Sequence, residues 1–267
     1  MKTAIQRPET LLVERDPRGV VRLTLNRPDI RNAFDGVLIS DLTICLDELA
    51  ADKAIRALVL TGAGAAFSAG AELNWMRSSG EQGDHENFQD ALRLAGVMHR
   101  LDTMPMPTIA RVNGAAMGGG VGLTACCDMA VAAEDALFAL SEVKLGIIPG
   151  AISPYVLRAI GPRNARRYFL TGERFDAETA FRIGLVHEVA PKGALDAGVD
   201  QLLAELLSAG PKAVRAAKDL IKHVAIKEID DLLSRDTAQR IAHQRVTDEA
   251  KEGLSAFLEK RKPGWTA

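Results

Sequence analysis

The order of apolar and polar residues predicts a β-hairpin near the start of the chain and several buried strands after it. Residues 11–13 are apolar and precede the turn-type sequence Asp16-Pro17-Arg18-Gly19, after which apolar and polar residues alternate over 21–26. Such alternation after a turn is typical of a hairpin with one buried face. Short, continuous apolar runs predict further strands, buried on both faces, at residues 57–61, 108–112, 129–133 and 136–140.

Leucines at helical spacing predict an amphipathic helix over residues 38–49, with Asp35 as its N-terminal cap. The polar stretch 78–90 is expected to form a surface loop or a loosely held helix. From about residue 154 onward the pattern is almost wholly helical. Because strands and helices alternate up to about residue 190 and helices dominate after it, we predict an α/β core over residues 1–200 and a helical C-terminal region over residues 201–267.

The composition of the 267 residues narrows the class of protein. Hydrophobic residues make up 47% and charged residues 25%, which is ordinary for a globular protein. The 33 basic and 35 acidic residues leave a net charge of -2, which gives no support for nucleic acid or an anionic membrane as a partner. No signal sequence or membrane span is indicated, and the three cysteines lack CxxC spacing. We therefore expect a soluble, cytoplasmic protein without a metal site.

Two segments rich in small residues, 66–73 and 112–123, each lie between a predicted strand and a predicted helix. Small residues let the backbone approach a ligand closely, and helix N-termini present unpaired N–H groups to it. Two such junctions can aim one N–H each at a single oxygen, which is an oxyanion hole. Tight packing of helix on sheet explains the same residues, and neither segment has the GxGxxG pattern of a dinucleotide site. Spacing alone does not decide between an oxyanion hole and tight packing of helix on sheet.

The two segments read AFSAGAE (66–72) and VNGAAMGGG (112–120), and CCDMAVAAEDALFALSEVKLGIIPG (126–150) follows them. Together they resemble the crotonase superfamily of enoyl-CoA hydratases and isomerases, and the resemblance extends from about Thr10 to Trp265. It implies a ClpP-like spiral of ββα units in an α/β fold, with a helical C-terminal trimerisation region. Within the family, residues 141–161 and 166–189 resemble bacterial hydratases of 3-methylglutaconyl-CoA and isohexenylglutaconyl-CoA most.

The resemblance also assigns roles to residues. It implies that the backbone N–H groups of Ala71 and Gly119 hold the thioester oxygen of an acyl-CoA and stabilise the enolate that forms at C2. The Phe257 and Lys260 positions match family residues that touch the CoA of a neighbouring subunit, although a core phenylalanine and a solvated lysine explain them equally. Arg31 is a weaker phosphate candidate. The implied substrate- and CoA-binding residues are Ala69, Ala71, Glu72, Leu73, Asn74, Gly119, Gly122, Phe257 and Lys260.

Hydratases of this family usually carry two catalytic glutamates. The second matches Glu142, whose pKa should be raised by burial, as a proton donor at neutral pH requires. The position of the first is occupied by Gly122. We expect the missing side chain at Gly122 to leave space for a water molecule, held by a carboxylate of the substrate, and for a 3-methyl group.

The resemblance therefore predicts an enoyl-CoA hydratase that acts on a branched or carboxylated 2-enoyl-CoA, such as 3-methylglutaconyl-CoA. It implies a homotrimer or a hexamer of two trimers, and no cofactor, since coenzyme A is part of the substrate. A single carboxylate such as Glu142 suffices for an enoyl-CoA isomerase, which is the first alternative. The second alternative is a non-catalytic relative that binds CoA or RNA, against which the intact set of Ala71, Gly119 and Glu142 argues.

Overall fold

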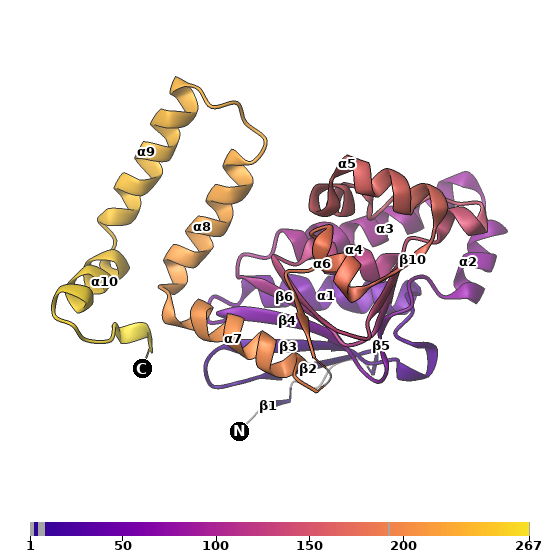
Figure 1. Cartoon of the computed structure of the whole chain (residues 1–267), viewed down its shortest axis with the longest axis horizontal. Coiled ribbons are helices and arrows are strands. Elements are labelled where there is room, and N and C mark those ends of the chain that lie inside the picture. Colours follow the sequence, from indigo (N-terminus) through magenta and orange to yellow (C-terminus); the bar gives the residue numbers. More distant parts are fainter. Residues whose placement is uncertain (1–2, 5–8, 192, 267) are drawn as a thin grey trace. The chain divides into compact units, whose positions relative to one another are not determined.

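The computed structural model describes residues 3–4, 9–191 and 193–266. The chain divides into two compact units, of which the first comprises residues 1–104 and 108–200 and the second residues 105–107 and 201–267. The first unit contains two β-sheets with helices packed on them, and the second is helical wherever it has regular structure (Figure 1). Among the described residues, we find no helix that is both long and apolar enough to cross a membrane.

A seven-stranded sheet forms the base of the first unit, in the order β1-β2-β3-β4-β6-β8-β11. The pairs β1–β2 and β2–β3 are antiparallel, which confirms the predicted hairpin, and every later pair is parallel. All residues of β4 are buried, as its continuous apolar run predicted. The strands are β1 (Thr3–Ala4), β2 (Leu11–Arg15), β3 (Val20–Leu25), β4 (Ala57–Gly62), β6 (Thr108–Val112), β8 (Met129–Ala133) and β11 (Glu188–Ala190).

A second sheet of four short strands has the order β10-β9-β7-β5. The strands β5, β7 and β9 run parallel, and β10 is antiparallel to β9. Since parallel neighbours end at the same edge of a sheet, the loops that follow β5, β7 and β9 lie close together. The strands are β5 (Ala66–Ser68), β7 (Ala115–Met117), β9 (Leu137–Ala139) and β10 (Arg174–Asp176).

The helices of the first unit gather largely on one side of the parallel strands (Figure 1). The predicted helix α1 begins where expected, because the Asp35 carboxylate accepts a 2.9 Å hydrogen bond from the N–H of Leu38. The helices are η1 (Pro28–Ile30), α1 (Gly36–Ala51), α2 (Leu73–Gly80), α3 (Asp84–Asp102), α4 (Gly119–Cys126), η2 (Glu142–Leu145), α5 (Ser153–Thr171), α6 (Ala177–Arg182) and α7 (Leu195–Ser208), whose last turns belong to the second unit.

Two expectations about local structure are refined. Of the two alternatives for residues 78–90, the structure has the helical one, since they form the end of α2 and the start of α3, and the Asn87 side chain donates to the carbonyl oxygens of Ser79 and Gly83 at 2.7 and 3.1 Å. The chain after residue 154 also contains the strands β10 and β11. Each strand has three residues, too few for an alternating pattern to stand out from the surrounding helical one.

The second unit contains α8 (Pro211–Val224), α9 (Asp231–Arg245), α10 (Asp248–Leu258) and η3 (Gly264–Thr266). Side chains cap two of these helices, since Asp230 accepts from the N–H of Leu233 and Thr247 from the N–H of Ala250. The Trp265 indole N–H donates to the carbonyl oxygen of Ser208 at 3.0 Å and ties the C-terminal turn to the end of α7.

Asp196, in the first turn of α7, joins that helix to the large sheet through Arg22 on β3 and Arg111 on β6, at 2.9–3.0 Å. Hydrogen bonds from Arg111 are the largest of the causes that lower the pKa of Asp196 to about 2, so its contribution to stability is present above pH 3.8 and is lost as the pH falls toward 2. We expect Asp196→Asn to cost about 1 kcal/mol or less, because the side chain is 55% exposed. Urea unfolding at pH 7 and pH 3 checks this, and a difference between variant and wild type that does not shrink at pH 3 would contradict it.

Candidate active site

Ala71 lies in the loop after β5, where Phe34 forms hydrogen bonds to the residues on either side of it, Gly70 and Glu72. The N–H of Phe34 donates to the carbonyl oxygen of Gly70 at 2.7 Å, and the N–H of Glu72 donates to that of Phe34 at 2.8 Å. These two bonds hold the backbone on both sides of Ala71, whose own N–H donates to no other described residue. Gly70 has a φ of +83°, a backbone conformation that residues other than glycine rarely adopt.

Asn32 is fully buried and holds the stretch that precedes Phe34. Its amide nitrogen donates to the carbonyl oxygens of Ala63 and Ala66 at 2.9 and 2.8 Å, and the Ser68 hydroxyl donates to its backbone oxygen at 2.9 Å. Neither Asn32 nor Phe34 is among the site residues that the sequence predicts. A positive φ of 56° at Asn32 agrees with the tolerance of asparagine for this conformation, but the sequence carries no signal that separates it from a surface asparagine.

Gly119 follows β7 and is the first residue of α4. Its N–H donates to no other residue of the described chain, as is usual in the first turn of a helix. A Cβ placed on Gly70 would lie 3.7 Å from the Gly119 nitrogen and 2.8 Å from the carbonyl oxygen of Met117. The fold thus brings the Ala71 loop and the start of α4 together, as an oxyanion hole requires.

Phe34 also contacts the second loop. A Cβ on Gly119 would lie 2.9 Å from Cε2 of the Phe34 ring, which is 1% exposed. One residue therefore fixes the backbone around Ala71 through its own backbone and supports Gly119 through its side chain. The close approach explains why a glycine stands at position 119.

Glu142 is the first residue of the 3-10 helix η2, in the loop after β9. Its Oε1 lies 2.9 Å from where a Cβ of Gly118 would be, so the carboxyl group rests on the residue directly before Gly119. Oε2 is buried and has no hydrogen-bond partner among the described residues. Burial raises the pKa of Glu142 against a smaller lowering by its own backbone N–H.

This arrangement combines two functions at one place. Two backbone N–H groups without partners stabilise negative charge that develops on an oxygen between them. A carboxyl group with a buried, unpartnered oxygen and a raised pKa is suited to take up and release a proton. Proton transfer at the carbon next to a carbonyl needs both.

Gly122 does not leave the space that we expected. A Cβ on Gly122 would lie 2.3 Å from Cγ2 and 2.8 Å from Cβ of Ile152, and 3.3 Å from Cε of Met98. The side chain of Ile152 therefore fills the volume above Gly122, and the interpretation of Gly122 as room for water or a methyl group is wrong. Nothing in the sequence indicates that a residue thirty positions away covers this glycine.

We expect Gly122→Ala to destabilise the protein by about 1–3 kcal/mol, since the added methyl group overpacks the contact with Ile152. This cost exceeds the roughly 0.5–1 kcal/mol that alanine gains over glycine inside a helix. Gly36→Ala, at the start of α1, is the matched control, because a Cβ there meets no atom within 4 Å. Urea unfolding compares the two variants, and equal stability would contradict the close contact.

Most of the other implied CoA-binding residues near Ala71 form hydrogen bonds within the protein. Glu72 caps α2 by accepting from the N–H of Trp75 at 2.7 Å, and it also accepts from the Asn74 side chain at 3.0 Å. The backbone N–H groups of Asn74 and Trp75 lower the pKa of Glu72. Leu73 is 71% exposed. Ala69, the remaining candidate here, donates its N–H to the carbonyl oxygen of Arg31 at 2.9 Å.

Phe257 and Lys260 belong to the second unit, at the end of α10 and directly after it. Phe257 is 80% exposed, so the alternative interpretation as a core phenylalanine is wrong. Lys260 is also exposed. The neighbouring Arg261 is held by the Glu252 and Glu259 carboxylates, each at 2.6 Å.

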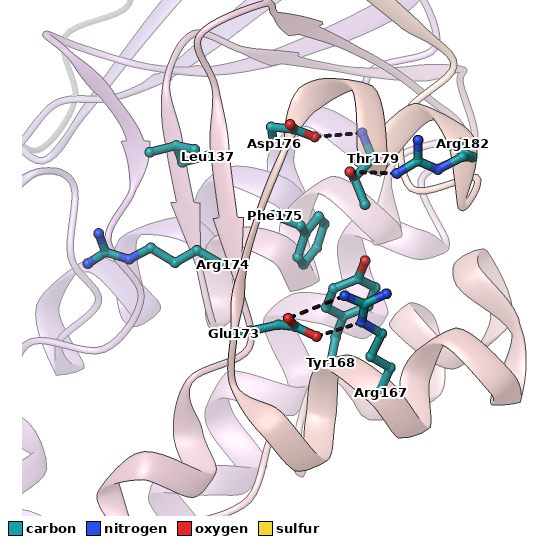
Figure 2. A pocket seen from close by; sticks show the side chains of 9 residues that line it. All are labelled: Leu137, Arg167, Tyr168, Glu173, Arg174, Phe175, Asp176, Thr179 and Arg182. Atoms are coloured by element: carbon teal, nitrogen blue, oxygen red, sulfur yellow. Dashed lines mark hydrogen bonds and ion pairs between the residues drawn. The ribbon is translucent and has the colours of Figure 1, made fainter.

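A surface pocket of about 350 Å³ lies beside β10 and contains none of the predicted site residues. Figure 2 shows Arg167 bonded to Glu173 beside the ring of Tyr168, both Asp176 and Arg182 bonded to Thr179, and Arg174 without a bond to the other residues drawn. Arg167 pairs with Glu173 at 2.6 Å, and Arg182 donates to the Thr179 hydroxyl at 2.9 Å. These hydrogen bonds stabilise the corner between α5 and α6. We assign this pocket no role in the reaction.

Two N–H groups, one from the loop after β5 and one from the start of α4, lie beside the carboxyl group of Glu142. This arrangement is typical of an enzyme of the crotonase type. The family model described as enoyl-CoA hydratase/isomerase matches residues 15–267, so the chain belongs to this family.

Individual proteins agree with this assignment. The crystal structure of an enoyl-CoA hydratase from Shewanella pealeana superposes with a TM-score of 0.92 at 44% identity, over 96% of each chain. The 2,3-dehydroadipyl-CoA hydratase of Escherichia coli is 35% identical over 95% of this chain and 97% of its own length. The crotonyl-CoA hydratase of Syntrophomonas wolfei is 34% identical over 95% and 96%.

Proposed function

We propose that the protein adds water across the 2,3 double bond of a 2-enoyl-CoA thioester. The single observation that carries this proposal is the position of the Glu142 carboxyl against Gly118, next to the N–H of Gly119 and the Ala71 loop. The relatives named for enoyl-CoA hydration support it.

In the proposed reaction the thioester oxygen accepts hydrogen bonds from the N–H groups of Ala71 and Gly119. Glu142 takes a proton from water as the water oxygen bonds to C3, and the electrons of the double bond move onto the thioester as an enolate. Glu142 then returns the proton to C2, so that one water is consumed and the carboxylate is regenerated. One oxyanion donor contributes about 3 kcal/mol to lowering such a barrier.

The proposed substrate is a branched or carboxylated enoyl-CoA such as 3-methylglutaconyl-CoA, on the basis of the resemblance of residues 141–161 and 166–189 to hydratases of such thioesters. The relatives from Escherichia coli and Syntrophomonas wolfei differ by one percentage point in identity to this chain and carry the names of a dehydroadipyl and a crotonyl thioester, so identity does not choose between the substrate classes.

Hydration kinetics on crotonyl-CoA, 3-methylcrotonyl-CoA and 3-methylglutaconyl-CoA test the substrate class. We expect kcat/KM for 3-methylglutaconyl-CoA to exceed that for crotonyl-CoA by more than about tenfold, which corresponds to about 1.4 kcal/mol of transition-state stabilisation. The 3-methylcrotonyl thioester separates the effect of the branch from that of the carboxylate. A rate on crotonyl-CoA as high as on the carboxylated substrate would overturn the substrate class and leave hydration itself standing.

We also propose a homotrimer or a hexamer of two trimers, with coenzyme A entering as part of the substrate and no further cofactor. Large apolar side chains in the second unit support assembly, since Ile226, Ile229, Phe257 and Leu258 are 79–92% exposed. In this assembly Phe257 and Lys260 would contact the CoA of a neighbouring subunit. Sedimentation equilibrium tests this proposal, and a monomer at micromolar concentration would contradict it.

A second candidate function, isomerisation of a 3-enoyl-CoA to a 2-enoyl-CoA, is favoured by one observation. Ile152 closes the position at Gly122 where a second carboxylate would stand, and a single carboxylate is enough to carry a proton between C4 and C2. The absorbance of the conjugated thioester separates the two reactions. It falls when a 2-enoyl-CoA is hydrated and rises when a 3-enoyl-CoA is isomerised.

A further inference from the structure

Two glycines at the start of α4 lie one helical turn apart, and the N–H of Gly122 donates to the carbonyl oxygen of Gly118 at 3.1 Å. A Cβ on either glycine would collide with one and the same chain segment, residues 142–152. Oε1 of Glu142 lies 2.9 Å from the position over Gly118, and Cγ2 of Ile152 lies 2.3 Å from the position over Gly122. The two ends of this segment thus rest on neighbouring turns of one helix.

The middle of segment 142–152 is exposed, with Leu145, Ile147 and Ile148 at 58%, 48% and 77%. Its end at Ile152 is 2% exposed and leads into α5, because the N–H groups of Tyr155 and Val156 both donate to the carbonyl oxygen of Ile152 at 3.1 Å. Packing at Ile152 therefore connects the Glu142 loop to α4 and to α5 at once.

We infer that Ile152 is a positioning residue for Glu142: its β-branched side chain, seated on Gly122, holds segment 142–152 so that the carboxyl group of Glu142 stays against Gly118 and beside the N–H of Gly119. This inference rests on the proposed role of Glu142 in hydration. It also gives Gly122 a function, since the missing Cβ is what admits Ile152.

No charged side chain of the described residues forms an ion pair with the Glu142 carboxyl group. The described part of α4 carries no charged side chain, and the thiol of Cys126 at its end lies against Met98. Lys144, on the same turn as Glu142, packs against Gly172 and, after Arg167, helps to lower the pKa of Glu173.

On α5, the titratable Tyr155 stacks with Arg158, whose guanidinium pairs with Asp102. Burial is the largest cause that raises the pKa of Glu142, and no charged side chain of the described residues is among its causes. Because burial is what raises the pKa of Glu142, a substitution at Ile152 that shifts segment 142–152 should change that pKa.

Two substitutions separate shape from volume at position 152. Ile152→Val keeps the Cγ2 methyl group that contacts Gly122, and we expect kcat within about twofold of wild type. Ile152→Leu keeps the volume but has no branch at Cβ. We expect Ile152→Leu to lower kcat by about tenfold or more with KM little changed. In the pH profile of kcat/KM, the limb on the acid side should move to lower pH, because water then reaches Glu142 and lowers its pKa. Ile152→Met, also unbranched, replaces the leucine variant if that fails to fold.

Ile160→Leu is the matched control, since Ile160 is 3% exposed on α5 and is not among the nearest neighbours of a Cβ placed on Gly118 or Gly122. It should lower Tm about as much as Ile152→Leu and leave kcat and the acid limb unchanged. Equal effects of Ile152→Leu and Ile160→Leu on kcat, with an unmoved acid limb in both, would overturn the inference.

A second readout does not depend on turnover. ¹³C NMR titration of the Glu142 carboxyl carbon, assigned by its absence in Glu142→Gln, measures the pKa directly. We expect the pKa to fall in Ile152→Leu and to stay in Ile152→Val and Ile160→Leu. An unchanged pKa in Ile152→Leu overturns the positioning role, whereas absence of hydration in wild type overturns the proposed function alone.

Discussion

Replacing Glu142 by glutamine is expected to lower kcat by about 10²–10⁴ with little change in the affinity for a CoA thioester. Glutamine has nearly the same size and fills the same place against Gly118, but it neither takes a proton from water nor returns one to C2. The measurement combines steady-state hydration with calorimetric binding of a saturated, unreactive acyl-CoA. Glu178→Gln, an exposed glutamate at the start of α6, is the control and should behave as wild type.

The same substitution should raise the stability of the fold at neutral pH. The pKa of Glu142 is raised on folding, so the folded state holds its proton more tightly than the unfolded chain. The Glu142 carboxyl group therefore does not lower the free energy of unfolding below pH 4.5, the pKa of the unfolded chain. It destabilises the fold increasingly as the pH rises from there through the pKa of the folded state. We expect the Tm of Glu142→Gln to exceed that of wild type at pH 7.5 and to match it at pH 4. A variant that is less stable at both pH values would show that the carboxylate has a partner in the folded protein.

How much of the fold was predictable depended on the length of each element. The helix α1 has four leucines at helical spacing and a capping aspartate, so its pattern is strong enough to locate both its buried face and its start. The strands β10 and β11 have three residues each and form through pairing with β9 and β8. Their existence depends on strands that are distant in the sequence, which a local pattern does not contain.

The candidate site shows the same division. The motifs around Ala71 and Gly119 are each contiguous in the sequence. Their small residues indicate that the backbone approaches another group closely at these positions. The supporting residues are different, because Phe34 contacts Gly119 across more than eighty positions and Ile152 covers Gly122 across thirty. An apolar residue in a loop has many possible neighbours, and only the packed structure selects one. The wrong expectation at Gly122 arose from treating the missing side chain as an empty volume, although protein interiors are close-packed.

Removing the N–H of Gly119 is expected to lower kcat/KM by about a hundredfold or more, as loss of one oxyanion donor does in other acyl-transfer sites. Gly119→Pro removes this N–H at the first position of α4, where a helix tolerates proline because that N–H has no partner within the helix. The variant should therefore fold, which circular dichroism and Tm verify.

Proline also brings a Cβ, which would lie 2.9 Å from the Phe34 ring, so the proline variant alone mixes two effects. Gly119→Ala supplies the same Cβ and keeps the N–H, and we expect it to lose less activity than Gly119→Pro by about two orders of magnitude. The ratio of kcat/KM between the two variants isolates the hydrogen bond from the steric contact. If alanine and proline reduce kcat/KM equally in folded protein, the contact between position 119 and Phe34 accounts for the whole loss, and the Gly119 N–H has no part in holding the oxyanion.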